Sequence, residues 1–220
     1  MNIANNILRN ALRNVYFLTG TAMGGKTTMA GALSKKYGFI HFNDNWHEES
    51  FLTWLSICDA KYQKKSSKRN IMSNEEYFSR TVEEFLSEDD YIGYGEYLEF
   101  AIIEIIRLSQ HSKVVADLSA PASLLSEISE YNRVACLLAS PELVTCAAYG
   151  KREDHREFLE CLLSLSDSDK KISVQDELFR IDIEKTHKEA REYGLFSVVR
   201  TEDSTIEGTL KLIEAHFGLA

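Results

Sequence analysis

Cysteine and proline are scarce in this chain of 220 residues, which has four of the first and two of the second. The cysteines, Cys58, Cys136, Cys146 and Cys161, form no Cys-x-x-Cys pair and lie mostly in apolar segments. The six histidines make no zinc-ligand spacing with them. This usage argues against a metal module and indicates free, buried thiols in a reducing cytoplasm.

The sequence also lacks an apolar run long enough to cross a membrane. Residues 1–14 lack the continuous apolar core of a secretory signal. Their apolar residues fall on a helical stripe, Ile3, Ile7, Leu8, Ala11 and Leu12. We expect a short helix packed on the domain. A partner-binding or membrane-surface helix is the alternative, with only Arg9 and Arg13 as cations.

Basic residues are fewer than acidic residues in this chain. The chain has 25 basic and 34 acidic side chains and a formal charge of −9. This balance argues against a nucleic-acid-binding surface, but it is compatible with a local basic phosphate pocket. The length suits one α/β domain with a helical insertion.

The strongest motif is Gly20-Thr-Ala-Met-Gly-Gly-Lys-Thr-Thr28, which matches Gly-x-x-x-x-Gly-Lys-Ser/Thr. The apolar run Val15–Thr19 before it predicts a buried strand, and the spacing over Thr27–Tyr37 predicts the helix after it. A strand, a glycine-rich loop and a helix form the context that this motif requires.

The spacing has a chemical reason. Glycines 20, 24 and 25 lack Cβ atoms, so the backbone can close around an anion and present its N–H groups to phosphate oxygens. Lys26 is expected to reach the β- and γ-phosphates, and the Thr27 hydroxyl to bind Mg²⁺. The predicted nucleotide-binding residues are Gly20, Thr21, Ala22, Met23, Gly24, Gly25, Lys26, Thr27 and Thr28. A glycine-rich turn with an exposed lysine is the alternative, which the flanking segments disfavour.

Five apolar segments are predicted as strands: Val15–Thr19, Phe39–Phe42, Lys113–Asp117, Arg133–Ala139 and Leu195–Val199. Helical patterns separate them, which predicts a three-layer α/β/α fold with a five-stranded parallel sheet. The predicted helices after the second strand are Glu48–Tyr62, Ser73–Leu86, Gly95–Gln110, Ala120–Tyr131, one opening at Ser140-Pro141, Val174–Tyr193 and Ser204–Phe217. Ser73 and Ser204 each begin a capping-box pattern.

Two segments are predicted to lie outside the sheet and the helices that cover it. Residues 45–92 are too long for an ordinary crossover and are predicted to form a helical insertion that covers a substrate. A basic polar loop is expected at Lys61–Asn70, and Arg80 could reach an anionic substrate, although a solvated arginine is the alternative. Residues 150–172 are predicted to form a lid-like segment, in which Leu165–Lys171 is rich in Ser, Asp and Lys and is predicted to be mobile.

Two acidic residues follow predicted strands. Asp117 ends an apolar strand, where its carboxylate could hold Mg²⁺ beside Thr27. Asp44 follows the second strand, at the sheet edge where ligands gather in open α/β folds. A turn or N-cap role for Asp44 has comparable weight. The linker Arg200–Asp203 follows the last strand, near where a base or ribose could rest.

Lys151, Arg152 and Arg156 form a cationic cluster, with the two arginines four apart on one expected helical face. Phosphoryl transfer requires cations on the transferring group, so this cluster is a candidate lid. The alternative is a surface cluster paired with its acidic neighbours Glu153, Asp154 and Glu157.

In these features the chain resembles the P-loop kinases that include nucleoside monophosphate, shikimate and gluconate kinases. The resemblance runs from Val15 to Phe217, but only the phosphate loop is specific. It implies a P-loop NTPase fold in which Lys26, Thr27 and Asp117 carry MgATP, Asp44 orients or deprotonates an acceptor hydroxyl, and Arg152 and Arg156 act from a lid. Asp117 is followed by Leu-Ser-Ala-Pro rather than the glycine-rich turn of shikimate kinases, so the acceptor stays open.

The sequence therefore predicts an ATP-dependent small-molecule kinase with Mg²⁺ as its metal. A non-catalytic ATP-binding regulator and a P-loop NTP hydrolase are the alternatives. A GTPase-type switch lacks support because neither Asn-Lys-x-Asp nor Asp-x-x-Gly follows a predicted strand.

Overall fold

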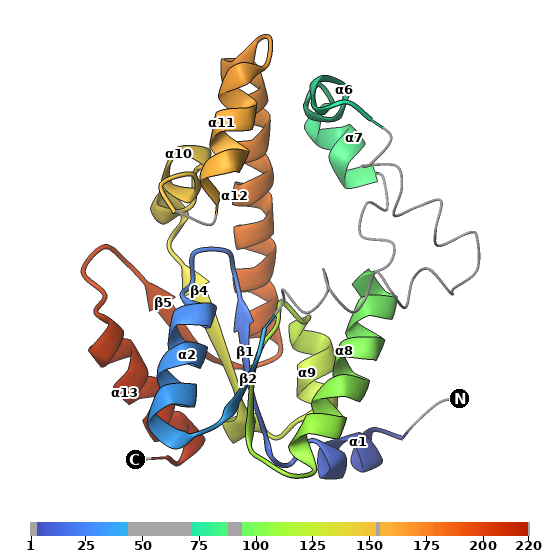
Figure 1. Cartoon of the computed structure of the whole chain (residues 1–220), viewed down its shortest axis with the longest axis vertical. Coiled ribbons are helices and arrows are strands. Elements are labelled where there is room, and N and C mark those ends of the chain that lie inside the picture. Colours follow the sequence, from blue (N-terminus) through green and yellow to red (C-terminus); the bar gives the residue numbers. More distant parts are fainter. Residues whose placement is uncertain (1–3, 44–71, 88–93, 153–154, 220) are drawn as a thin grey trace.

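The computed structural model describes residues 4–43, 72–87, 94–152 and 155–219. The predicted helix Glu48–Tyr62 and loop Lys61–Asn70 lie outside these ranges. The described part contains a five-stranded sheet with the order β2-β3-β1-β4-β5 (Figure 1). Its strands are β1 (Val15–Gly20), β2 (Ile40–Phe42), β3 (Val114–Asp117), β4 (Val134–Ala139) and β5 (Phe196–Arg200). All four neighbouring pairs are parallel, as the sequence predicted.

Helices cover both faces of the sheet, and the alternation along β1 shows why. Val15 and Phe17 point to one hydrophobic cluster, whereas Tyr16 and Leu18 point to another. The first face is covered by α8 (Tyr94–Ser109) and α9 (Ala122–Ile128), with α1 (Asn5–Ala11) packed against α9. The second face is covered by α2 (Lys26–Tyr37) and α13 (Ile206–Phe217). The three-layer α/β architecture is confirmed.

The longest described helix connects the sheet to the lid-like segment. α12 (Ser168–Glu192) has 25 residues, which makes it about 37 Å long. One end packs on β4, and the other extends beyond the carboxyl edge of the sheet (Figure 1). There it contacts α10 (Cys146–Tyr149), α11 (Arg156–Ser164) and the insertion helix α7 (Val82–Ser87). Two short 3-10 turns, η2 (Tyr131–Arg133) and η3 (Pro141–Leu143), flank β4.

The predicted single helix over Ser73–Leu86 is two helices, α6 (Asn74–Phe78) and α7. Ser73 forms the predicted capping box with Glu76. A second reciprocal pair then follows: Glu84 N–H donates to Thr81 Oγ1 at 3.2 Å, and Thr81 N–H donates to the Glu84 carboxylate at 2.7 Å. Thr-x-x-Glu is itself a helix-start signal, so the chain restarts its helix at Thr81.

Other boundaries also differ from the prediction. The helix predicted over Ala120–Tyr131 spans only Ala122–Ile128, and Ser140-Pro141 opens the short 3-10 turn η3. The helix predicted from Val174 begins at Ser168, within the segment Leu165–Lys171 that was predicted to be mobile. A tertiary contact favours the helix here, since Lys171 is buried against the insertion. The last helix is capped by Thr205, whose hydroxyl accepts from Gly208 N–H at 3.1 Å, and not by Ser204. Ser204 instead accepts from Thr201 N–H at 2.9 Å within the preceding turn.

No helix in the described ranges has the length and apolar character needed to cross a membrane.

Candidate functional site

The loop between β1 and α2, residues 20–28, is called the phosphate loop below. It approaches the backbone of β4 so closely that glycine is required twice. A Cβ atom at Gly20 would lie 2.1 Å from Leu137 O, and so would one at Gly24. Gly20 and Gly25 also have positive φ angles of 123° and 93°, which residues with a Cβ atom rarely adopt. Glycine is thus required at positions 20 and 24 by the close approach to β4, and is favoured at positions 20 and 25 by the positive φ angles.

Thr21 ties the phosphate loop to the sheet. Its backbone N–H donates to Leu137 O at 3.1 Å, and its hydroxyl accepts from Ala139 N–H at 2.7 Å. The side chain is 1% exposed. The strand β4 thus holds the first turn of the loop through both backbone and side chain. Sequence analysis placed Thr21 in the loop without this anchoring role.

Lys26 lies across the phosphate loop. Its ammonium group donates to Thr21 O at 3.0 Å and to Gly20 O at 3.3 Å. Both acceptors are neutral carbonyl oxygens, so an anion in the loop could compete for the same donors. The predicted lysine therefore stands at the centre of the candidate anion site.

Thr27 and Asp117 lie on the same side of the sheet. Asp117 pairs in register with Leu18 and follows Val115 by two residues, so it shares the sheet face that α2 covers. Thr27 is the second residue of α2 and is exposed, whereas Asp117 is 3% exposed. Among the described residues no three His, Cys, Asp or Glu side chains gather as a metal site. A hydroxyl and a carboxylate, completed by phosphate oxygens, nevertheless form a donor set suited to Mg²⁺.

His41 is a site neighbour that sequence analysis missed. It lies on β2, with Nε2 3.9 Å from Asp117 Oδ2. This nitrogen is buried and has no hydrogen-bond partner among the described residues. Its placement follows from the strand period, because His41 pairs with Val115 and so shares the Asp117 face. A histidine between Ile40 and Phe42 in a predicted buried strand was the available signal.

Of the three predicted lid cations, the structure brings Arg152 to the phosphate loop. Its Nη1 lies 4.0 Å from Met23 Sδ. Arg156 is the first residue of α11 and is exposed, as is Lys151. The prediction that Arg152 and Arg156 share a helical face is wrong, because Arg152 precedes α11 in a turn.

α12 adds side chains to this region that the sequence did not identify. Ile183 belongs to the hydrophobic cluster that packs with Ala22 and Met23 of the phosphate loop. Its neighbour Asp182 lies within the electrostatic influence of Lys26. Asp182 is an exposed residue of α12, and partial desolvation raises its pKa against the opposing charges of Lys185 and Lys26. α12 therefore packs against the phosphate loop through Ile183.

Two other predicted residues, Asp44 and Arg80, are not seen at the phosphate loop in the described part of the structure. Asp44 lies outside the described residues, so its predicted place near the acceptor stays a prediction. Arg80 is 9% exposed and packs over the rings of Tyr77, at 4.2 Å, and Phe85, at 3.9 Å. The alternative of a solvated Arg80 is therefore wrong, because aromatic packing has buried the guanidinium group.

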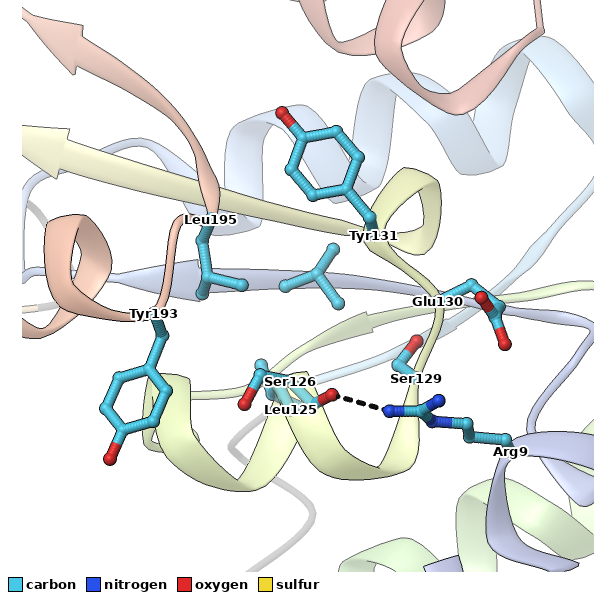
Figure 2. Close-up of a pocket in the computed structure, with 9 residues that line it drawn as sticks. Arg9, Leu125, Ser126, Ser129, Glu130, Tyr131, Tyr193 and Leu195 are labelled. Atoms are coloured by element: carbon cyan, nitrogen blue, oxygen red, sulfur yellow. Dashed lines mark hydrogen bonds between the residues drawn. The ribbon is translucent and has the colours of Figure 1, made fainter. Parts of the chain in front are cut away.

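A cavity of about 250 Å³ lies at the opposite edge of the sheet, where strands β4 and β5 begin (Figure 2). Figure 2 shows Tyr131, Tyr193 and Leu195 on one side and Ser129, Glu130 and Arg9 on the other. The Arg9 guanidinium donates to Ser126 O and Glu127 O at 2.9 and 2.8 Å, so it caps the end of α9. This cavity is separate from the phosphate loop and holds none of the predicted site residues.

The sequence matches no protein-family model and no curated protein. The functional assignment therefore depends on the site itself.

Proposed function

We propose that this protein is an ATP-dependent small-molecule kinase that transfers the γ-phosphoryl group to a hydroxyl or phosphate of a metabolite. One observation carries the proposal. The phosphate loop closes at the carboxyl end of β1 with two sterically required glycines and with Lys26 across it. Ligands in open parallel sheets bind at this edge, where loop amides and the helix N-terminus favour an anion.

The phosphate loop supplies binding and charge. Its backbone amides would donate to the β-phosphate oxygens of ATP, and Lys26 would exchange its carbonyl acceptors for phosphate oxygens. Phosphoryl transfer requires little covalent chemistry from the protein, so positioning and charge neutralisation supply most of the rate. A site rich in backbone hydrogen-bond donors suits catalysis by positioning and charge neutralisation.

Thr27 and Asp117 would hold Mg²⁺, which when bound neutralises charge on the phosphates. The donor chemistry fits because Thr27 lies on α2, the helix that covers the sheet face to which Asp117 belongs. His41, 3.9 Å from Asp117, would help to fix the orientation of this carboxylate.

The position of the lid-like segment favours the proposal of a phosphoryl transferase over that of an ATP hydrolase. Arg152 approaches the loop at Met23, and α12 carries α11 beyond the sheet edge. A cation that closes over the phosphates excludes water and stabilises charge on the transferring group. Asp44, following β2, remains the proposed residue that orients or deprotonates the acceptor hydroxyl.

A coupled ADP-release assay with MgATP and a metabolite library tests the proposal. We expect one acceptor class to raise turnover well above the background hydrolysis of ATP. If no acceptor does so while ATP binds, the kinase proposal fails and a regulator or hydrolase takes its place. Where an acceptor does raise turnover, Asp44→Asn should lose that acceptor-dependent turnover while ATP binding persists.

A further inference from the structure

Met23 adopts a backbone conformation that its residue type disfavours. Its φ is +59°, and Asp167 is the only other described non-glycine residue with a positive φ. The Cβ atom makes the left-handed region unfavourable for such residues. Met23 lies in the middle of the phosphate loop, so something must hold it in this conformation.

Arg200 is in contact with Met23. It is the last residue of β5, and its Nη1 donates to Met23 O at 2.7 Å. The Arg200 backbone is itself held by β4, because Ser140 N–H donates to Arg200 O at 2.9 Å and Ala139 pairs with Arg200 in register. The guanidinium group therefore extends from a fixed strand end to the loop.

The Met23–Gly24 peptide is held at both of its polar ends. Its carbonyl oxygen accepts from Arg200, and its N–H donates to Thr21 O at 3.3 Å. A peptide group is planar, so two such bonds determine its orientation. That orientation limits the directions available to the Gly25 and Lys26 amides, which follow in the chain.

We propose that Arg200 is a positioning residue for the phosphate loop. It holds Met23 in the left-handed conformation, so that the next amides face the anion site before a nucleotide arrives. This inference rests on the proposed function, but the state of the loop is measurable without nucleotide. An arginine that touched the γ-phosphate directly would behave differently, because ADP would not sense it.

Hydrogen exchange of nucleotide-free protein tests the positioning itself. For Arg200→Ala we expect exchange at the Gly24 amide, which donates to Thr21 O, to rise about tenfold, the value of one charge-assisted hydrogen bond discounted for exposure. Arg107→Ala is the matched control, since Arg107 is an exposed arginine paired with Glu104 on α8. Unchanged exchange in Arg200→Ala would overturn the inference, whether or not ATP binds.

Calorimetric titration then separates positioning from phosphate contact. We expect Arg200→Ala to raise the Kd of MgATP and MgADP by the same factor, about tenfold, because both nucleotides use the loop amides. Arg200→Lys should restore most of the affinity. A loss for MgATP alone would make Arg200 a phosphate contact and overturn positioning. Failure of the unaltered protein to bind either nucleotide would instead reject the proposed function, leaving the exchange result to decide the inference.

A final test repeats the Arg200→Ala substitution in a Met23→Gly variant. Glycine adopts positive φ readily, so the loop no longer needs Arg200 to hold that conformation. In Met23→Gly, the further change Arg200→Ala should alter exchange and affinity less than threefold, against about tenfold alone. Equal losses in both backgrounds would show that Arg200 does not act through Met23.

Discussion

The carbonyl oxygen of Leu137 determines which residue types the phosphate loop can use at two positions. Gly24 is the more informative of these, since its φ is not positive and only space restricts it. Gly31 on α2 offers a comparison, because a Cβ atom there would meet nothing within 4 Å. Substitution of Gly24 therefore tests the steric contact with Leu137, whereas substitution of Gly31 tests helix propensity alone.

Gly24→Ala should therefore displace the loop from β4. We expect a loss of about 1–3 kcal/mol in the free energy of unfolding, as for other overpacked sites, together with a loss of nucleotide binding. Gly31→Ala should stabilise the protein by about 0.5–1 kcal/mol, because alanine favours a helix interior. Urea denaturation of both variants measures this, and a neutral Gly24→Ala would contradict the close approach.

Thr21→Val removes the hydroxyl that accepts from Ala139 N–H but keeps the side-chain shape. The buried N–H is left without that acceptor, so we expect a loss of about 1–3 kcal/mol in unfolding free energy. Thr21→Ser keeps the hydroxyl and should recover most of the loss. If valine were tolerated as well as serine, the anchoring role of Thr21 would be wrong.

Cys136 is buried at 1% exposure on β4. Burial raises the pKa of its thiol to about 12, with the Lys26 charge opposing the rise. The reactive thiolate is then rare at neutral pH. We expect Cys136 to resist a thiol reagent at pH 8 in the native protein and to react after unfolding, as followed by peptide mass spectrometry. Rapid native labelling would contradict this environment.

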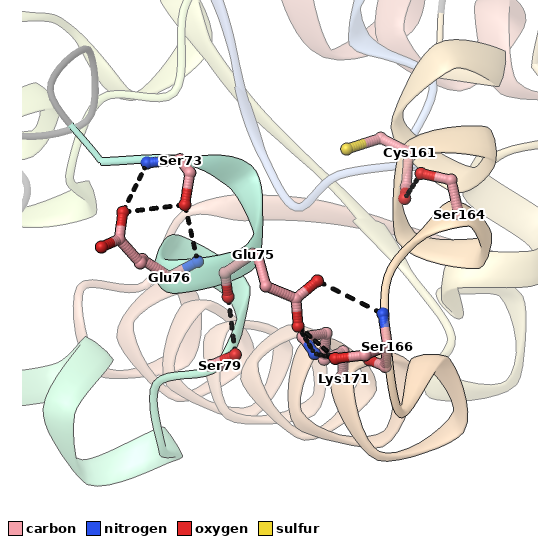
Figure 3. Close-up of polar contacts among 8 residues, drawn as sticks. All are labelled: Ser73, Glu75, Glu76, Ser79, Cys161, Ser164, Ser166 and Lys171. Carbon is pink, nitrogen blue, oxygen red and sulfur yellow. Dashed lines mark hydrogen bonds and ion pairs between the residues drawn. The ribbon is translucent and has the colours of Figure 1, made fainter.

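Among the elements, the contact between α6 and the α11–α12 hairpin joins the insertion to the lid. Glu75 accepts from Lys171 Nζ at 2.7 Å and from Ser166 N–H at 3.2 Å, and it also pairs with the Ser166 hydroxyl (Figure 3). Phe78 is buried beside it in a cluster with Leu162. The described insertion helix therefore packs on the lid-like segment, and the two should move together.

Glu75→Ala should loosen this contact, because Lys171 is 4% exposed and would lose its carboxylate partner. We expect faster hydrogen exchange in residues 74–78, whereas Glu83→Ala, an exposed glutamate on α7, should leave it unchanged.

Hydrogen bonding by Lys171 and Ser166 lowers the Glu75 pKa from 4.5 to about 2. The contact therefore stabilises docking above about pH 4.5 and weakens as the pH falls toward 2. Exchange that is insensitive to Glu75→Ala would contradict this role.

The elements that local patterns specify were predictable from the sequence. The five strands and the capping box at Ser73 follow from hydrophobic period and capping chemistry, and the structure confirms them. The start of α12 at Ser168 was not predictable, because a polar segment becomes helical through Lys171 and its distant partner Glu75. His41 was missed as a site neighbour, and Arg200 was predicted near a base or ribose rather than against Met23, because both contacts depend on which strands lie side by side.

At the scale of the whole molecule, three separate segments converge on the phosphate loop. β4 holds Thr21, β5 holds Met23 through Arg200, and α12 packs on Met23 through Ile183. α12 also contacts the insertion helix α7, so the loop that we propose to bind nucleotide is connected to the elements that would cover an acceptor. Ligand binding to such a loop stabilises the whole folded state, by about 2.7 kcal/mol at a ligand concentration of 100 Kd.

Calorimetric titration of MgATP into the protein and into Lys26→Ala tests the central claim most directly. We expect the unaltered protein to bind one nucleotide, and Lys26→Ala to lose at least about 100-fold in affinity, since a charge-assisted contact to phosphate is removed. Lys35→Ala, an exposed lysine on the same helix, is the matched control and should bind normally. No binding by the unaltered protein, or equal binding by Lys26→Ala, would contradict the account.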